Sequence, residues 1–221
     1  MAPSRTLLLS LVSLVALTSL AVAGAPDAAR PVGAPPPASG LLAEGFVLIG
    51  EEKGVRVYRR EKRAGIELAA EGTLGAAPER VRRVLIDYPS HQRWQPRLKE
   101  SRVLARGGDS LDVYQRLTLP VLDDRDFTLN VTWGAQAEVL WVRFAAANAR
   151  GPAPISDAVR VNDQEGGWRL EPADGGLATR AVYRFHMDLG GSFPAWMGKS
   201  QATSEVPELF DNIAKQLSRY P

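Results

Sequence analysis

Apolar and polar residues alternate along two neighbouring segments of the chain, residues 111–120 and 126–133. Such alternation is typical of antiparallel strands that turn one face to a core and the other to water. Among the residues expected to face inward, Gln115 is the one polar side chain. These inward residues are Val113, Gln115, Leu117 and Leu119 in the first segment, and Phe127, Leu129, Val131 and Trp133 in the second.

Other short apolar runs that end at glycine-containing turns also predict strands. The segment 137–147 is apolar on both faces, and its charge-free face consists of Leu140, Val142 and Phe144. A glycine-rich turn at 174–176 joins the last two strands into a hairpin. The remaining strands are placed at 54–62, 66–74, 166–172 and 178–189, with one more leading up to residue 106.

Two segments show helical spacing instead. Residues 77–88 have Pro78 near the first turn and an apolar stripe of Val81, Val84 and Leu85. In residues 192–220, Pro207 is expected to kink the helix or split it, because proline supplies no backbone donor. The apolar residues of this second helix are Ala202, Val206, Leu209, Phe210, Ile213 and Leu217. The predicted order is two strands, a helix, at least five strands and a long C-terminal helix, which is an α+β fold.

The N-terminal part of the chain differs in composition from the rest. Residues 1–23 carry Arg5, an apolar stretch and the ending Ala21-Val22-Ala23, which is typical of a cleaved signal peptide. Residues 24–40 are rich in Pro, Ala and Gly and predict a linker without a core. The folded domain is therefore expected at 41–221, in an exported protein that is periplasmic or extracellular.

Composition and charge exclude several classes of function. The chain is 45% hydrophobic and 24% charged, as in ordinary globular proteins, and its net charge of +2 argues against nucleic-acid binding. It has no cysteine, so disulfides, thiol catalysis and cysteine-bound zinc are excluded. No cofactor and no metal site are expected. The two histidines lack ligand-spaced partners; His91 is expected in an exposed loop, and His186 is expected to face water.

Four consecutive charges, Asp123, Asp124, Arg125 and Asp126, stand between the two alternating segments. Close carboxylates beside an arginine can serve acid–base catalysis, or they can form a polar turn. No partner base or nucleophile accompanies them, so a strand-connecting turn at the rim is preferred, with Arg125 paired to a neighbouring aspartate. In a strand, adjacent residues such as Asp123 and Asp124 would point to opposite faces.

Several motifs together resemble one family. "VLIDYPSHQRWQPRLKESRVL", "YQRLTLPVLDDRDFTL", "GGWRLEP" and "GGSFPAWM" before a long helix are similar to START domains, the steroidogenic-acute-regulatory-related lipid-transfer family, especially its bacterial members. The key matches are Asp87, Trp94 and Pro96, and the run Arg125, Asp126 and Phe127. The resemblance covers about Leu41 to Tyr220. It implies a helix-grip fold, in which a curved antiparallel sheet wraps around the C-terminal helix and encloses a hydrophobic tunnel.

The resemblance also implies which residues line the tunnel. Gln115 is the candidate to fix a ligand's head group, and the alternative is an amide satisfied by neighbouring backbone. In the sterol-binding animal members of the family, an acid–base pair lies inside the tunnel. Val131 stands at the position of the arginine of that pair, which argues against the same pair here and against a sterol as the ligand. Trp196, after Gly190-Gly191, either meets ligand or a membrane surface, or simply packs. The expected lining is Gln115, Leu117, Leu119, Phe127, Leu129, Val131, Trp133, Phe144, Tyr183, Phe185, Trp196, Ala202 and Val206.

The function that follows is the binding and transfer of a lipid or another hydrophobic molecule between membranes. The protein is expected to be a monomer that contacts membrane surfaces transiently and is not an enzyme. Two alternatives remain open. One is an enzyme of the same superfamily, such as a polyketide cyclase or aromatase, and the other is a module that senses a ligand for a partner protein.

Overall fold

The computed structural model describes residues 35–36, 40–61, 66–119, 122–188 and 195–221, and in the last helix the side chains from Thr203 onward. The elements occur in the predicted order, with additions. The strands are β1 (Val47–Glu52), β2 (Val55–Glu61), β3 (Ile66–Leu74), β4 (Leu98–Arg106), β5 (Ser110–Leu119), β6 (Leu122–Gln136), β7 (Val139–Ala146), β8 (Ala158–Arg160), β9 (Asp163–Ala173) and β10 (Ala178–Asp188). The helices are α1 (Pro78–Ile86), α2 (Tyr88–His91) and α3 (Ala195–Gln216).

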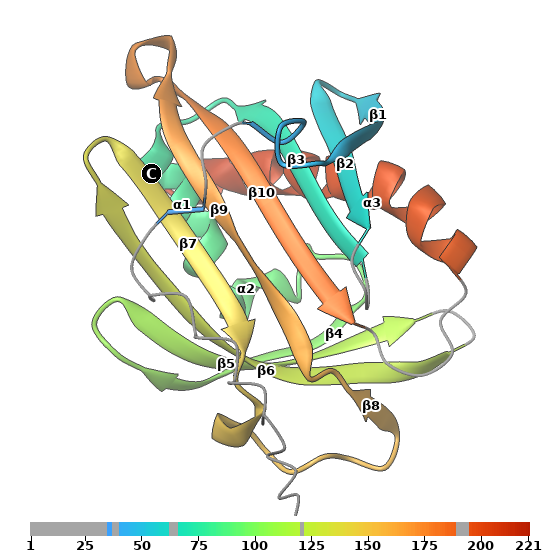
Figure 1. The fold of residues 1–221 in the computed structure, drawn as a ribbon. Coiled ribbons are helices and arrows are strands. Elements are labelled where there is room, and N and C mark those ends of the chain that lie inside the picture. The colour runs from blue at the N-terminus through green and yellow to red at the C-terminus, as the bar shows by residue number, and fades with distance from the viewer. Residues whose placement is uncertain (1–34, 37–39, 62–65, 120–121, 189–194) are drawn as a thin grey trace, which may run out of the picture. The chain divides into compact units, whose positions relative to one another are not determined.

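The strands form one curved sheet in the order β1-β2-β3-β10-β9-β7-β6-β5-β4, and β8 pairs with β6 (Figure 1). Every pair along this path is antiparallel, while β8 runs parallel to β6. The antiparallel sheet predicted from alternation is therefore confirmed. Two strands were not predicted: β1, which precedes the first expected strand, and the short β8.

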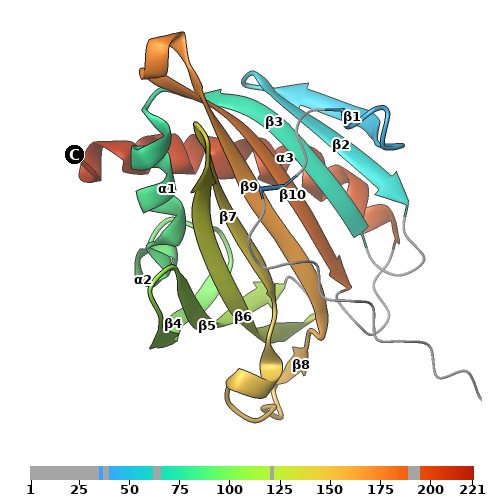
Figure 2. The same cartoon turned by 60° about the vertical axis from the view of Figure 1, so that its left-hand side comes forward.

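The three helices lie on one face of the sheet, called the inner face here (Figure 2). Helix α1 buries Val81, Val84 and Leu85, as its spacing predicts, and packs against β7, β9 and β10. Helix α3 crosses β1, β2 and β3. It continues through Pro207 as one element, so the proline does not split it. None of the described helices is long and apolar enough to cross a membrane.

The core fills the space between the inner face and the helices. The inward residues of the central strands, such as Phe127, Leu129 and Val142, belong to the same continuous cluster as Phe210 and Ile213 of α3. Burying apolar surface in this way stabilises a fold by about 25 cal/mol per Å². The expected helix-grip arrangement, a curved antiparallel sheet around a long C-terminal helix, is thus observed.

Part of the N-terminal segment covers the opposite, outer face. Leu41 and Phe46 are buried there against Tyr58 and Ala69. Glu44 fixes this segment through a two-bond ion pair with Arg184, at 2.6 and 2.7 Å. One residue of the expected linker also contacts the domain. Pro36 is buried, and its carbonyl accepts a hydrogen bond from Arg169 at 3.4 Å. Residues 24–34 and 37–39 of the expected linker, and the predicted signal peptide, lie outside the described residues.

Candidate functional site

The inner face brings together most of the side chains predicted to line a tunnel. Gln115, Phe127, Leu129, Val131, Phe144 and Val206 are buried there. Leu117, Trp133, Tyr183 and Phe185 are partly buried and pack against the same core, and Leu119 is half-buried at the end of β5. Trp196 and Ala202 belong to α3, but their side chains lie outside the described residues. Their role as ligand contacts stays a prediction.

A small group of neutral polar side chains lies on this apolar face, and we call it the inner polar cluster: Tyr88, Ser101, Gln115 and Tyr183. Gln115 donates from Nε2 to Ser101 Oγ at 3.2 Å, and Ser101 donates to the backbone oxygen of Tyr88 at 2.8 Å. The amide of Gln115 is therefore held by a side-chain hydroxyl rather than by backbone. Its oxygen makes no hydrogen bond within the described residues.

The two tyrosines of the cluster differ from Ser101 and Gln115 in the partners of their polar groups. Within the described residues, neither the Tyr88 nor the Tyr183 hydroxyl makes a hydrogen bond. Burial raises the pKa of both phenols, and the proximity of Tyr88 raises the pKa of Tyr183 further. A stacked contact with Trp168, at 4.5 Å between ring centroids, fixes the Tyr183 ring. Tyr88 is buried and Tyr183 partly buried, and neither hydroxyl is among the fully buried polar atoms that lack a partner.

Tyr88 and Ser101 were not among the predicted site residues. A signal for Tyr88 exists in the sequence, because it continues the stripe of Val81, Val84 and Leu85 by one more helical turn. The continuity is interrupted, because α1 ends at Ile86 and α2 begins at Tyr88. Asp87 lies between the two helices, and Pro89 follows directly after Tyr88. Ser101 has no comparable signal, because its role depends on the pairing of β4 with β5.

The four consecutive charges do not form a turn, and that prediction is wrong. They lie within β6, which begins at Leu122, because Leu122 already pairs with Leu119. Alternation places Asp124 and Asp126 on the face opposite to Asp123 and Arg125. Arg125 is 3% exposed on the inner face, and its Nη1 donates a hydrogen bond to the backbone oxygen of Asp123 at 2.7 Å. It also has further protein interactions.

Asp124 and Asp126 form ion pairs on the outer face. Asp126 is fully buried and accepts two bonds from Arg160, at 2.9 and 2.8 Å, and a third from the Tyr114 hydroxyl at 3.2 Å. Arg160 belongs to β8, so this pair holds the segment around β8 on β6. Asp124 accepts bonds from Lys99 and Arg116. Asp124 and Asp126 are thus held in ion pairs that stabilise the fold.

Both histidines are buried, which corrects the two predictions made for them. His91 is not in an exposed loop, because residues 88–91 form α2 and its ring packs between Tyr88 and Trp94. Burial lowers the pKa of His91 to about 4. His186 and Phe185 point to opposite faces of the sheet, so His186 is on the outer face. It is nevertheless buried there, and its Nε2 lies 3.1 Å from Asp163 Oδ2. No three described His, Asp or Glu residues are grouped to hold a metal.

The motif that begins at Asp87 anchors the C-terminus. Tyr220 donates its hydroxyl proton to Asp87 Oδ2 at 2.6 Å and lies 3.1 Å from the Ser90 hydroxyl. Trp94 Nε1 reaches the same hydroxyl at 3.5 Å. These contacts tie the end of the α3 region to the start of α2. In the N-terminal half of α3, Glu205 forms an ion pair with Arg97 at 2.8 Å.

A curved antiparallel sheet that closes over a long helix, with an apolar inner face and a few neutral polar groups, defines a helix-grip protein built to bind or transfer hydrophobic molecules. Residues 66–219, more than half of the chain, match the family described as polyketide cyclase/dehydrase and lipid transport. The chain belongs to this family. The START resemblance expected from the motifs is confirmed by the same match and by solved structures.

Solved START-domain structures share this fold. A STAR-related lipid transfer protein from Xanthomonas axonopodis is 24% identical, with a TM-score of 0.70, and the alignment covers 79% of this chain and 99% of that one. The human StAR-related lipid transfer protein 5 is 18% identical, with a TM-score of 0.71 and coverage of 80% and 88%. Human STARD10 is 20% identical, with a TM-score of 0.71 and coverage of 80% and 75%. A search of curated proteins gave no match.

Proposed function

We propose that the protein binds a single amphipathic lipid between the inner face and α3, and carries it between membranes. The head group is held by the inner polar cluster. The observation that carries this proposal is the pair of tyrosines on the inner face, Tyr88 and Tyr183, whose hydroxyls make no hydrogen bond within the described residues. A ligand's polar group would give each hydroxyl a hydrogen-bond partner, worth about 0.5–1.5 kcal/mol net.

The exposure of Tyr183 supports an enclosed space. Burial raises the pKa of its phenol, so protein surrounds the group, yet the side chain keeps accessible surface. Phe185 and Leu117, on the same inner face, also keep accessible surface while they pack against the core. This combination is expected for side chains that line an internal cavity, where an acyl chain gains about 25 cal/mol per Å² of buried apolar surface.

The chemistry of the cluster favours a head group without net charge. Two phenols with raised pKa values stay neutral, and Gln115 offers an uncharged amide oxygen. Arg125, the nearby cation of the inner face, is already engaged by the backbone of Asp123 and by further protein groups. We therefore favour a hydroxyl, carbonyl or amide head group over a carboxylate or phosphate.

Removing both hydroxyls tests the head-group site. We expect the double variant Tyr88→Phe, Tyr183→Phe to retain its fold but to bind the co-purified lipid about tenfold or more weakly, because up to two hydrogen bonds are lost. Native mass spectrometry and extraction of lipid from the purified protein give the readout. Tyr114→Phe, which removes a hydroxyl bonded to Asp126 on the outer face, is the matched control and should keep its lipid.

Three results would contradict parts of this proposal. Absence of any extractable or loadable apolar ligand from the unmodified protein would remove lipid binding altogether. Equal lipid retention by the double variant and the unmodified protein would keep lipid binding but move the head group away from the tyrosines. Extraction of acidic lipids alone would contradict the neutral head group.

Ligand entry requires part of the wall to move, and we propose the N-terminal half of α3. Its far end is tied down through Tyr220 and Asp87, and Pro207 removes one backbone bond between the halves. We expect residues 192–206 to exchange amide hydrogens faster than 208–217 in the empty protein, and bound lipid to abolish the difference. Equal protection in both halves, with and without lipid, would rule out this gate.

The location and the reaction class complete the proposal. Residues 1–23 have the pattern of a signal peptide, so we propose export, with transfer between membranes of the periplasm or outside the cell.

The second candidate function is that of an enzyme of the cyclase type, since the family includes cyclases and dehydrases. Turnover of an aromatic polyketide that is lost on changing Gln115 or Tyr183 would favour the enzyme over the carrier.

A further inference from the structure

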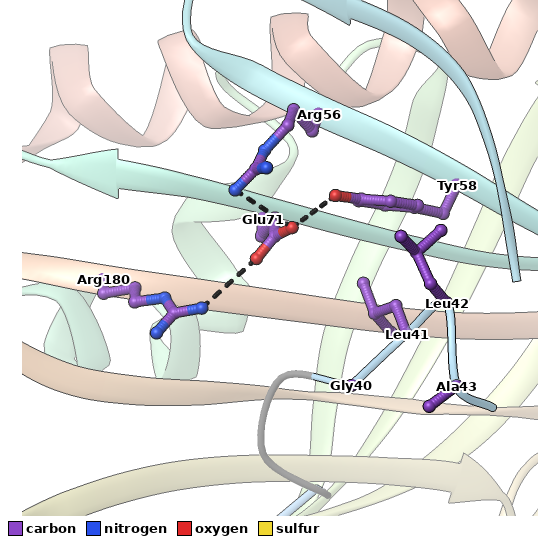
Figure 3. A pocket seen from close by; sticks show the side chains of 8 residues that line it. All are labelled: Gly40, Leu41, Leu42, Ala43, Arg56, Tyr58, Glu71 and Arg180. Carbon is purple, nitrogen blue, oxygen red and sulfur yellow. Dashed lines mark hydrogen bonds and ion pairs between the residues drawn. The ribbon is translucent and has the colours of Figure 1, made fainter.

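A second pocket lies on the outer face of the sheet, away from the inner polar cluster. Its volume is about 400 Å³, within the range of small-molecule sites. One wall is the N-terminal turn, and the floor consists of side chains of β2, β3 and β10 (Figure 3). The lining residues are Gly40, Leu41, Leu42, Ala43, Arg56, Tyr58, Glu71 and Arg180. We call it the outer pocket.

Glu71 lies in the floor of the pocket between two arginines, so one negative charge faces two positive charges. Its carboxylate accepts a hydrogen bond from Tyr58 and forms ion pairs with Arg56 at 3.2 Å and Arg180 at 3.4 Å. Tyr58 stays neutral, because burial and the bond to Glu71 raise its pKa. The lining residues therefore hold two guanidinium groups against one carboxylate, a net charge of +1.

The arginines retain donors for a ligand. Glu71 forms an ion pair with only one nitrogen of each guanidinium. Both arginine side chains are about half exposed, whereas Glu71 is nearly buried. A second carboxylate, Glu171, lies 3.9 Å from Arg180 but forms its closer pair, at 2.7 Å, with Arg169. A guanidinium has five N–H groups arranged to bind planar or tetrahedral oxyanions.

The other wall is apolar. Leu41 is buried, whereas Leu42 is 68% exposed beside the arginines, a high value for a leucine. Figure 3 shows both leucines on the same side of the pocket, next to the Tyr58 ring. An oxyanion with a short apolar part would place its charge against the guanidinium nitrogens of Arg56 and Arg180 that do not pair with Glu71, and its apolar part against Leu42.

We propose that the outer pocket is a second binding site, for an amphipathic oxyanion such as a phosphate monoester or carboxylate with an apolar part. The site is separate from the lipid site proposed on the inner face and does not depend on it. The same chemistry occurs in free metabolites and in the head groups of acidic lipids at a membrane surface. Neither Arg56 nor Arg180 contributes to the inner polar cluster or to the buried core.

Titration with hexyl phosphate, followed by amide NMR shifts of the purified protein, tests the site. We expect shifts at residues 40–43, 56, 71 and 180, weaker shifts with inorganic phosphate, and none with hexanol. The variants Arg56→Gln and Arg180→Gln should each weaken binding about tenfold, the usual order for a lost charged hydrogen bond. Arg102→Gln, a similarly exposed arginine paired with Glu100, is the matched control and should bind normally.

Glu71→Gln separates ligand binding from a purely structural role. Removing the competing carboxylate should tighten hexyl phosphate binding, whereas a structural cluster predicts the same loss as the arginine variants. Sedimentation with phosphatidylglycerol vesicles, but not phosphatidylcholine vesicles, that is lost in the arginine variants would identify acidic lipid as the source. Binding of hexyl phosphate without vesicle binding would identify a free ligand. Absence of shifts, shifts confined to the inner face, or unchanged affinity in both arginine variants would overturn the proposal.

Discussion

Replacing Asp126 with alanine is expected to lower the free energy of unfolding by about 3–5 kcal/mol, the usual cost of removing one partner from a buried ion pair. Asp126 is fully buried, and Nε and Nη2 of Arg160 and the Tyr114 hydroxyl donate to it. Without the carboxylate, the nearly buried guanidinium of Arg160 loses its counter-charge. Urea unfolding followed by circular dichroism gives the measurement.

The same motif supplies the control. Asp123 is exposed in the same strand, and it contributes a backbone oxygen, not its carboxylate, to Arg125. Asp123→Ala should therefore change stability by no more than about 0.5 kcal/mol. The double variant Asp126→Leu, Arg160→Met should recover part of the loss, because it leaves no unpaired charge. Similar stability of the Asp126→Ala and Asp123→Ala variants would show that the pair does not hold β8.

Acid should destabilise the protein between pH 6.5 and 4 through His91. Burial lowers the pKa of this histidine from 6.5 to about 4 in the folded state. Below pH 6.5 the unfolded chain therefore binds a proton that the folded chain rejects, so stability falls as pH decreases and stops falling near pH 4. A gap of about 2.5 pH units corresponds to about 3 kcal/mol. Urea unfolding at pH 7.5 and pH 4.5 captures most of this loss.

His91→Gln should remove most of the pH dependence in this window. Glutamine keeps a donor for the Val84 carbonyl, which lies 3.2 Å from His91 Nε2, but does not titrate. Carboxylates such as Asp124, whose pKa is lowered by Lys99, lose their contribution only below about pH 4, so the two effects are separable. His186→Gln is the control. An unchanged pH dependence in His91→Gln would show that His91 is not the group responsible.

Local pattern was enough to predict most of the secondary structure. The strand at 66–74 has the predicted bounds, and alternation assigned the inward faces of β5 and β6 correctly. This succeeds because side-chain direction in a strand depends only on parity along the chain. β1 was missed because it is a short edge strand without clear alternation, and its glycine bulge at Gly50 faces Thr203 of α3.

Predictions that depended on the environment of a side chain were less successful. His91 and His186 were expected in water, and Arg125 was expected at a rim, yet all three are buried. The sequence places a residue on a face, but burial depends on what covers that face. His91 is buried because residues 88–91 form a helical turn that packs on the domain. Arg125 is buried because it lies on the inner face of a strand that begins four residues earlier than predicted.

By itself, the sequence determined the α+β order, the apolar inner faces, the START resemblance and Gln115 as the polar residue on an apolar face, because these depend on periodicity and on motifs read along the chain. Only the tertiary structure decided which polar groups meet. Tyr88, Gln115 and Tyr183 come from α2, β5 and β10, and Arg56, Glu71 and Arg180 come from three strands whose order is not sequential. Contacts of this kind arise from strand pairing and helix packing between distant segments, and no local pattern encodes them.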